Sequence, residues 1–130
     1  MGKKVLVIIP AYNEQESILS TVQSVQSFGY DYVVVNDGSR DDTLNVCREN
    51  GLNVLDLAQN LGIGGAVQAG HKYAQRYGYD IDVQVDGDGQ HDPAFIELLV
   101  REVDAGADMA IGSRFLEETA GFKSTLLRRI

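Results

Sequence analysis

The 130 residues, 44% of them hydrophobic and 23% charged, suffice for one globular domain and include no low-complexity tract that would indicate disorder. The formal net charge of -8 would repel phosphate backbones and anionic membrane surfaces, and basic residues cluster only at Lys3-Lys4 and Arg128-Arg129, so we expect no nucleic-acid partner. We predict a single domain over residues 1–130.

The chain begins with a strand followed by a helix. Val5 to Ile9 is continuously apolar and β-branched, which is typical of a strand buried on both faces, and it is too short for a signal-peptide core or a membrane span. Apolar residues then recur at helical spacing until Gly29: Ile18, Val22 and Val25. With no membrane segment, the chain as given should be soluble.

A second strand and helix follow. Tyr32 to Val35 predicts the strand, and Ser39 with Asp42 three residues later resembles a capping box that opens a helix ending near Gly51. Asn53 to Leu57 predicts the third strand. The lone cysteine, Cys47, lies in the apolar pattern of this second helix, so we expect a buried structural thiol, which suits a reducing cytoplasm.

The remaining elements continue the alternation. One face of the next helix is predicted from Ile63, Val67, Gly70, Ala74 and Tyr77. Ile81 to Val85 predicts a fourth strand, and Asp108 to Ile111 a fifth. The helix between them should begin with Asp92 as its N-cap and Pro93 in its first turn, and should bury Phe95, Leu99 and Val103.

This alternation predicts an α/β fold, a three-layer structure with a mainly parallel sheet and helices on both faces. If the strand order is 3-2-1-4, it reverses between the first and fourth strands, and ligands bind at the carboxyl ends there. The loops that would form the site are Pro10 to Glu14, Asn36 to Asp42 and Asp86 to Asp92.

An acidic loop follows the fourth predicted strand. Asp86 and Asp88, one residue apart beside glycines, can converge on one hard cation such as Mg²⁺ or Mn²⁺, although a solvated acidic turn would also fit the pattern. A calcium loop of the EF-hand type fits poorly, because His91 occupies its glycine position and Pro93 interrupts it. His91 adjoins this loop and His71 falls in a helix, and we interpret both as structural.

The glycine-rich run at residues 60–66 differs from a dinucleotide fingerprint, since Val67 stands where the third glycine belongs, and no ATPase-type phosphate loop is present. Gly64 and Gly65 would let helix-terminal amides approach a diphosphate, or would serve close helix packing. Asp37, after the second strand, could accept hydrogen bonds from a nucleobase; taken alone, turn chemistry explains it better.

Five motifs together resemble glycosyltransferase family 2, in its dolichol-phosphate-mannose-synthase-like, polyprenyl-phosphate branch. They extend over residues 4 to about 116 and are Ile9-Pro10-Ala11-Tyr12-Asn13-Glu14, Val35-Asn36-Asp37-Gly38-Ser39, Asn60-Leu61-Gly62-Ile63-Gly64-Gly65-Ala66, Asp86-Gly87-Asp88-Gly89-Gln90-His91-Asp92-Pro93 and Gly112-Ser113-Arg114-Phe115. The resemblance implies the Rossmann-like GT-A fold and a nucleoside diphosphate sugar, linked to UDP or GDP, as donor.

The resemblance also implies roles for individual residues. Asp86 and Asp88, with Gln90 as a further ligand, would hold the divalent cation, and Asp88 and Arg114 would act at the diphosphate or sugar. The residues implied in nucleotide binding are Pro10, Ala11, Tyr12, Glu14, Val35, Asp37, Gly64, Asp86 and Gly87.

The reaction implied is inverting transfer of the sugar to an acceptor, a polyprenyl phosphate or a sugar hydroxyl. A lipid phosphate is already anionic and needs no general base, whereas a hydroxyl would need a carboxylate. The chain ends without a stop signal in its pattern, so we expect the acceptor-binding half, any base and any membrane anchor beyond Ile130. The chain alone would then bind nucleotide without transferring sugar, and its uncovered sheet edge would favour a homo-oligomer.

Two other functions compete with this one: a nucleotide-binding module without activity of its own, and a receiver-like domain that binds Mg²⁺ for phosphoryl transfer. The receiver reading leaves Pro10 to Glu14 unexplained and lacks the expected lysine, since Arg114 stands there. We expect a cytoplasmic protein, at the cytoplasmic face of the membrane in its full-length form.

Overall fold

The computed structural model describes residues 4–85, 109–111 and 126–129. They form three helices and six strands. The helices are α1 (Ile18–Ser27), α2 (Thr43–Glu49) and α3 (Gly62–Arg76). The strands are β1 (Val5–Ala11), β2 (Asp31–Asn36), β3 (Val54–Asp56), β4 (Ile81–Gln84), β5 (Met109–Ile111) and β6 (Leu126–Arg129).

The sheet has the order β3-β2-β1-β4-β6-β5. Its first four strands are parallel, so the predicted order 3-2-1-4 is confirmed. β5 lies within the predicted range, but β6 was not predicted and pairs antiparallel with both β4 and β5. Two leucines followed by two arginines have neither strand nor helix periodicity, so the local sequence does not predict the pairing with β4 and β5.

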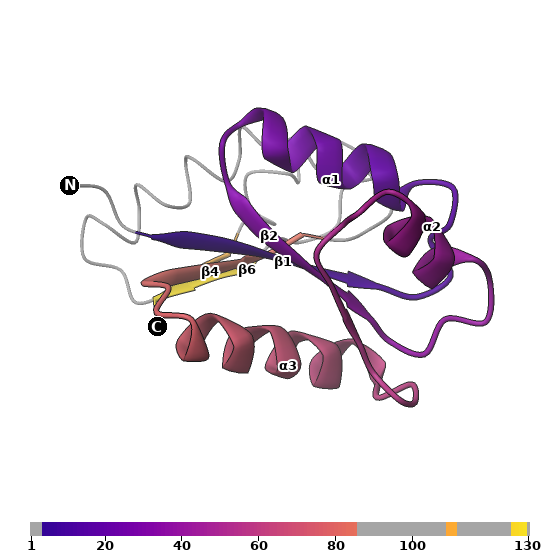
Figure 1. Ribbon diagram of the computed structural model, residues 1–130. Helices are drawn as coiled ribbons and strands as arrows, with labels where there is room; N and C mark the ends of the chain where they lie inside the picture. Colours follow the sequence, from indigo (N-terminus) through magenta and orange to yellow (C-terminus); the bar gives the residue numbers. More distant parts are fainter. Residues whose placement is uncertain (1–3, 86–108, 112–125, 130) are drawn as a thin grey trace.

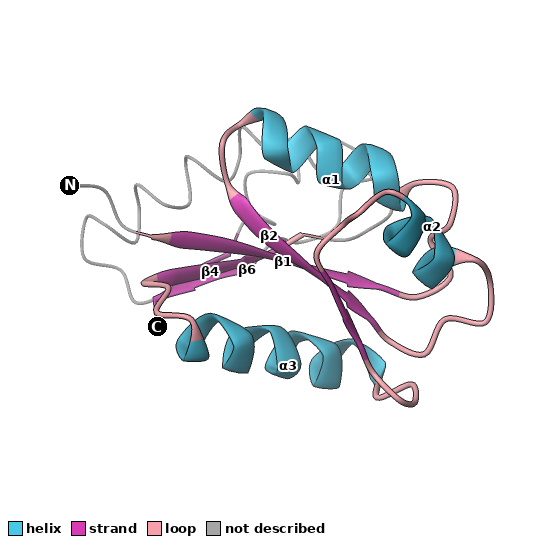
Figure 2. Cartoon of the chain, viewed as in Figure 1, coloured by secondary structure: helices cyan, strands magenta, loops and turns pink. Residues whose placement is uncertain are grey.

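Helices cover the sheet on both faces, as predicted (Figure 1). α1 and α2 lie on one face and α3 on the other, which Figure 2 shows as cyan layers on either side of the magenta strands. Residues of β1 alternate between two apolar cores: Val7 and Ile9 join α1 and α2, whereas Leu6 and Ile8 join α3. This explains why β1 is apolar throughout. Cys47 is buried in the first core as a free thiol, as expected.

The prediction that Ser39 and Asp42 form a capping box is wrong. α2 begins at Thr43, and Asp42 occupies its N-cap position, but the Asp42 side chain accepts no capping hydrogen bond from a backbone N–H of the helix. The Ser39 hydroxyl instead accepts a hydrogen bond from the backbone N–H of Asn13, at 3.0 Å. Ser39 therefore contacts a loop distant in sequence instead of capping α2, and a local sequence pattern cannot predict such a contact.

The buried face of α3 is shorter than the helical face predicted from the sequence. Ala66, Val67, Gly70 and Ala74 are buried, whereas Ile63 is 60% and Tyr77 54% exposed. Both lie at the ends of α3. The Tyr77 ring contacts the Tyr73 ring, with 4.5 Å between their centroids, and contributes nothing to the core beneath the helix.

Gly70 sets how closely α3 approaches the sheet. A Cβ atom at this position would lie 2.4 Å from Cγ2 of Ile8, a fully buried residue, so one of the two would have to shift. Gly70→Ala should therefore lower the free energy of unfolding by about 1 to 3 kcal/mol, the usual cost of overpacking. Gly64→Ala is the matched control, because nothing lies within 4 Å of its added Cβ. Urea denaturation of both variants checks this, and equal stability would contradict the close approach.

Candidate functional site

Three loops gather at the carboxyl ends of β1, β2 and β3, at the right of Figure 1. They are residues 12–17 before α1, 37–42 before α2 and 57–61 before α3. In a parallel sheet this edge combines backbone groups and helix N-termini from neighbouring units, which favours ligand binding there. Two of the three loops predicted to form the site lie here, and the third, Asp86 to Asp92, is outside the described residues.

Asn13 joins the first two loops. Its φ of 55° lies in the left-handed region, which asparagine tolerates better than most residues. In this conformation its Oδ1 accepts the backbone N–H of Arg40 at 2.9 Å, and the N–H of Glu14 donates to Oγ1 of Thr43 at 2.8 Å. The turn after β1 is therefore held against the turn after β2. The sequence signal was the asparagine at the end of an apolar strand, to which we assigned no role of its own.

Asp41 anchors the same junction. Burial raises the pKa of its carboxyl, but hydrogen bonds from the Thr43 hydroxyl and from the N–H groups of Thr43 and Gln15 outweigh burial, so the pKa lies below its usual 3.8. A carboxyl whose pKa is lowered on folding stabilises the fold above its unfolded pKa, and this stability is lost as the pH falls through the folded value.

Asp41→Asn should accordingly flatten the acid side of the stability profile. Between pH 5 and pH 3 the parent should lose more stability than the variant, because only the parent contains this carboxylate. Denaturant midpoints measured across that range check the prediction, and parallel profiles for the two proteins would contradict the role of Asp41.

Asp37 joins the second and third loops. Its side chain is only 4% exposed; Oδ1 accepts the backbone N–H of Leu61 at 2.7 Å, while its own N–H donates to the Ala11 carbonyl at 2.9 Å. The next residue, Gly38, has φ +69°, and a Cβ there would lie 2.6 Å from the Asn60 nitrogen. Both the conformation and the close approach require glycine. Asp37 thus fixes the entrance to α3.

A cavity of about 390 Å³ opens among these loops. Tyr12 lines it from the first loop, 43% exposed, and Ser39 and Arg40 line it from the second. At its base Asn36 donates from Nδ2 to Oδ1 of Asp56 at 2.9 Å, across the paired ends of β2 and β3. The side-chain Oδ1 of Asn36 is buried without a hydrogen-bond partner in the described part of the chain. The cavity is polar and suits a ligand with hydrogen-bonding edges.

Seven of the nine residues predicted to bind nucleotide are described, and they fall into two groups in the structure. Tyr12, Glu14, Asp37 and Gly64 lie on the loops or at the start of α3, whereas the side chains of Pro10, Ala11 and Val35 are buried in the sheet. Val35 packs in the core beneath α3, and its strand is paired with β1 on one side and with β3 on the other. Gly64 is exposed and makes no close helix contact; Gly70 has that packing role.

The predicted metal ligands Asp86, Asp88 and Gln90 lie outside the described residues, as do Gly87, His91 and Arg114. Val85, immediately before them, donates its N–H to the Ile8 carbonyl at 2.9 Å, so the chain leaves β4 beside β1. Within residues 4–85, no three His, Cys, Asp or Glu side chains gather as a metal site. None of the helices described is long and apolar enough to cross a membrane.

His71, interpreted as structural, links α3 to the sheet. Its Nδ1 contacts Oδ2 of Asp82 on β4, and both side chains are largely buried. Asp82 lies on the face of the sheet that α3 covers, beside an apolar core. A buried carboxylate there would be unfavourable without a partner. The pair explains why this strand tolerates a carboxylate, because buried charges in proteins are paired.

Comparison with known proteins identifies the family. Residues 6–130 match the model of the family described as "Glycosyl transferase family 2". The chain is 38% identical to polyprenol monophosphomannose synthase of Mycolicibacterium smegmatis over 122 residues, 88% of this chain and 46% of that protein. It is 34% identical to a UDP-N-acetylglucosamine--dolichyl-phosphate N-acetylglucosaminyltransferase of Methanococcus voltae, covering 86% of this chain and 52% of that protein.

The fold has a counterpart among solved structures. Glucosyl-3-phosphoglycerate synthase from Mycobacterium tuberculosis, in complex with Mn²⁺, UDP and phosphoglyceric acid, superposes with a TM-score of 0.67 at 26% identity, over 85% of this chain and 42% of that one. The chain spans about half the length of the curated relatives it matches. On the family match, the identities and the shared sheet, the chain belongs to glycosyltransferase family 2 and has the GT-A fold.

Proposed function

We propose that the protein transfers a sugar from a nucleoside diphosphate sugar to a polyprenyl phosphate, with inversion at the anomeric carbon and with a divalent cation at the diphosphate. The observation that carries the proposal is the arrangement at the carboxyl ends of β1 and β2. There the buried Asp37 carboxylate and the exposed Tyr12 ring lie on loops fastened to one another by Asn13. The carboxylate can hydrogen-bond to one edge of the nucleobase, and the tyrosine ring can stack on one face of the nucleoside.

Six of the described residues have a part in this proposal. Asp37 uses one oxygen on Leu61, and the second oxygen is the acceptor we assign to the nucleobase N–H edge. Tyr12 offers its ring as a stacking surface, and Gly64 leaves the first turn of α3 open to the approach of a phosphate. Pro10, Ala11 and Val35 shape the floor beneath the nucleoside.

The acidic loop supplies the rest of the proposed site. Asp86 and Asp88, with Gln90, would hold Mg²⁺ or Mn²⁺. Their side chains offer oxygen ligands, which suit either ion. When bound, the cation stabilises the charge that builds on the leaving diphosphate. Arg114 would add a positive charge near the same phosphates or the sugar. The solved relative with Mn²⁺ and UDP supports this arrangement.

A lipid acceptor agrees with the relatives and with the chemistry. Two relatives are named for transfer to polyprenol or dolichyl phosphate. A phosphate oxygen is anionic at neutral pH, so it can attack the anomeric carbon without a general base. Because such an acceptor resides in a bilayer, we place the reaction at the cytoplasmic face of the membrane.

A transfer assay with the full-length protein tests the proposal. GDP- and UDP-linked sugars labelled in the sugar would be supplied with polyprenyl phosphate vesicles and Mn²⁺ or Mg²⁺. We expect label in the lipid fraction for one donor, with inverted anomeric configuration by NMR, and none after EDTA treatment. Label appearing only in free sugar or in a soluble acceptor would contradict the assignment of the lipid phosphate.

A further inference from the structure

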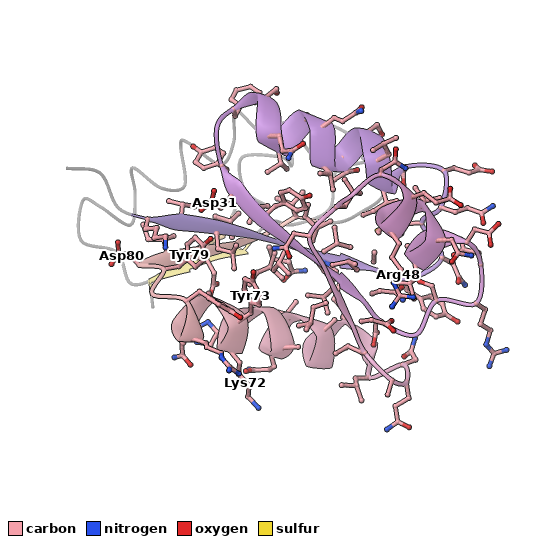
Figure 3. The ribbon with its side chains drawn as sticks, in the orientation of Figure 1. Asp31, Arg48, Lys72, Tyr73, Tyr79 and Asp80 are labelled. Carbon is pink, nitrogen blue, oxygen red and sulfur yellow. The ribbon has the colours of Figure 1, made fainter. Side chains whose placement is uncertain are left out.

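A second cavity lies at the opposite end of the sheet, where β2 and β3 begin. It measures about 300 Å³ and is lined by Gln26, Tyr30, Asp31, Tyr32, Asn53 and Tyr79. These residues come from the end of α1, the starts of β2 and β3, and the turn between α3 and β4. Figure 3 shows Tyr79 and Asp31 beside each other at this end, with Tyr73 below them on α3. The proposed donor site uses none of these residues.

Tyr79 is held in a fixed position within this tyrosine pocket. Its hydroxyl donates to Oδ2 of Asp31 at 2.9 Å, and the Lys4 ammonium lies 4.4 Å from the centroid of its ring. Burial, the hydrogen bond to Asp31 and the charge of that carboxylate raise the pKa of Tyr79 to about 12, so the hydroxyl stays protonated and keeps donating. The second oxygen of Asp31 remains available as an acceptor on the pocket wall.

Asn53 is fixed in the same way. Its backbone N–H donates to the Tyr32 hydroxyl at 2.9 Å, and its Nδ2 donates to the Tyr32 carbonyl at 2.9 Å and to the Tyr73 hydroxyl at 3.1 Å. Both amide hydrogens are therefore used inside the protein. The side-chain Oδ1 of Asn53 is left as an acceptor, and the exposed Gln26 amide provides both a donor and an acceptor.

We propose that this tyrosine pocket is a saccharide-binding site that takes a single pyranose ring. A pyranose has an apolar C–H face, which matches a tyrosine ring, and a rim of hydroxyl groups that both donate and accept. Planar carboxylate and carboxamide groups meet such hydroxyls, and here their geometry is set before a ligand arrives, which lowers the entropy cost of binding. A cavity of about 300 Å³ is of the size expected for a small-molecule site.

An alkylammonium ion is the competing ligand, since tyrosine rings beside a carboxylate also bind cations. In this pocket the protein already supplies that cation, because Lys4 occupies a face of Tyr79. The amide donor of Gln26 also exceeds what a cation can use, because a cation accepts no hydrogen bond. Hydroxyl groups can satisfy the carboxamide donor of Gln26 as well as the acceptors.

Saturation-transfer difference NMR with the full-length protein tests the site. The probes are methyl α-D-mannopyranoside and methyl β-D-glucopyranoside, with tetramethylammonium as the competing cation and with GDP and Mn²⁺ added to fill the donor site. We expect a glycoside signal that persists when GDP and Mn²⁺ are present. Loss of the signal on adding GDP would place the sugar at the donor site and overturn the proposal.

Three variants locate the binding. Asp31→Ala removes the carboxylate and should weaken glycoside binding about tenfold or more. Gln26→Ala, on the exposed surface of α1, is a milder change that should weaken binding without affecting folding. Glu49→Ala, at the exposed end of α2, is the control and should bind as the parent does. Equal signals in all three, or binding of tetramethylammonium alone, would overturn the proposal whatever the outcome of the transfer assay.

Discussion

Replacing Asp37 with asparagine should weaken nucleotide diphosphate binding about 5- to 150-fold while leaving the free energy of unfolding within about 0.5 kcal/mol of the parent. Asparagine retains an oxygen that can accept the Leu61 N–H, the hydrogen bond that Asp37 makes at 2.7 Å. Its second terminal atom becomes a donor and would face the donor edge of the base. A buried hydrogen bond lost in this way costs about 1 to 3 kcal/mol, which corresponds to that range of affinity.

Asp37→Leu separates the two roles. Leucine can neither accept the Leu61 N–H nor meet the base, so both the stability and the binding should fall, the stability by about 1 to 3 kcal/mol. Isothermal titration calorimetry with GDP and UDP, beside urea denaturation of each variant, gives both quantities. Unchanged affinity in a stably folded Asp37→Asn protein would assign Asp37 to its turn alone and remove it from the nucleotide site.

Asp88→Ala should abolish tight Mn²⁺ binding and weaken nucleotide diphosphate binding by about a hundredfold or more. With the cation absent, Asp86 and the diphosphate would face each other as like charges. Two unit charges about 4 Å apart near a protein surface repel by roughly 4 kcal/mol, which exceeds the cost of losing any single hydrogen bond proposed for the site. Electron paramagnetic resonance of Mn²⁺ counts the ions bound by each protein.

Glu49→Ala is the matched control for this prediction. It removes the same charge from the exposed end of α2, away from the acidic loop in sequence and from the loops of the site, so Mn²⁺ and nucleotide binding should both match the parent. A similar loss in the two variants would show that overall charge, rather than coordination by Asp88, governs cation binding.

Most of the sheet could be predicted from the sequence because each parallel strand is a separate apolar run. Val5 to Ile9 contributes side chains to both cores, and a continuous apolar run of this length is typical of a buried parallel strand. β6 was missed because its regularity comes from β4, across more than forty residues of chain. The exposure of Ile63 and Tyr77 at the ends of α3 could not be predicted, because periodicity identifies which side of a helix is apolar and says nothing about where the sheet beneath it ends.

The position of the candidate site could be predicted from the sequence, but the hydrogen bonds within it could not. The strand order placed the loops containing Tyr12 and Asp37 at one edge, and the structure has them there. The hydrogen bonds that unite these loops depend on a left-handed Asn13 and on the loss of the cap expected from Ser39. A contact between residues 26 positions apart leaves no periodic trace in a single sequence. The roles of Asp86, Asp88, Gln90 and Arg114 stay predictions.

Calorimetric titration of GDP and UDP into the protein, with Mn²⁺, with Mg²⁺ and with EDTA, tests the central claim most directly. That claim is that the carboxyl ends of β1, β2 and β4 together form a cation-dependent site for a nucleoside diphosphate. We predict saturable binding of one nucleotide in the presence of either cation and a fall of about a hundredfold or more in EDTA. Equal affinity under all three conditions would contradict the claim, because the acidic loop would then contribute no cation to the site.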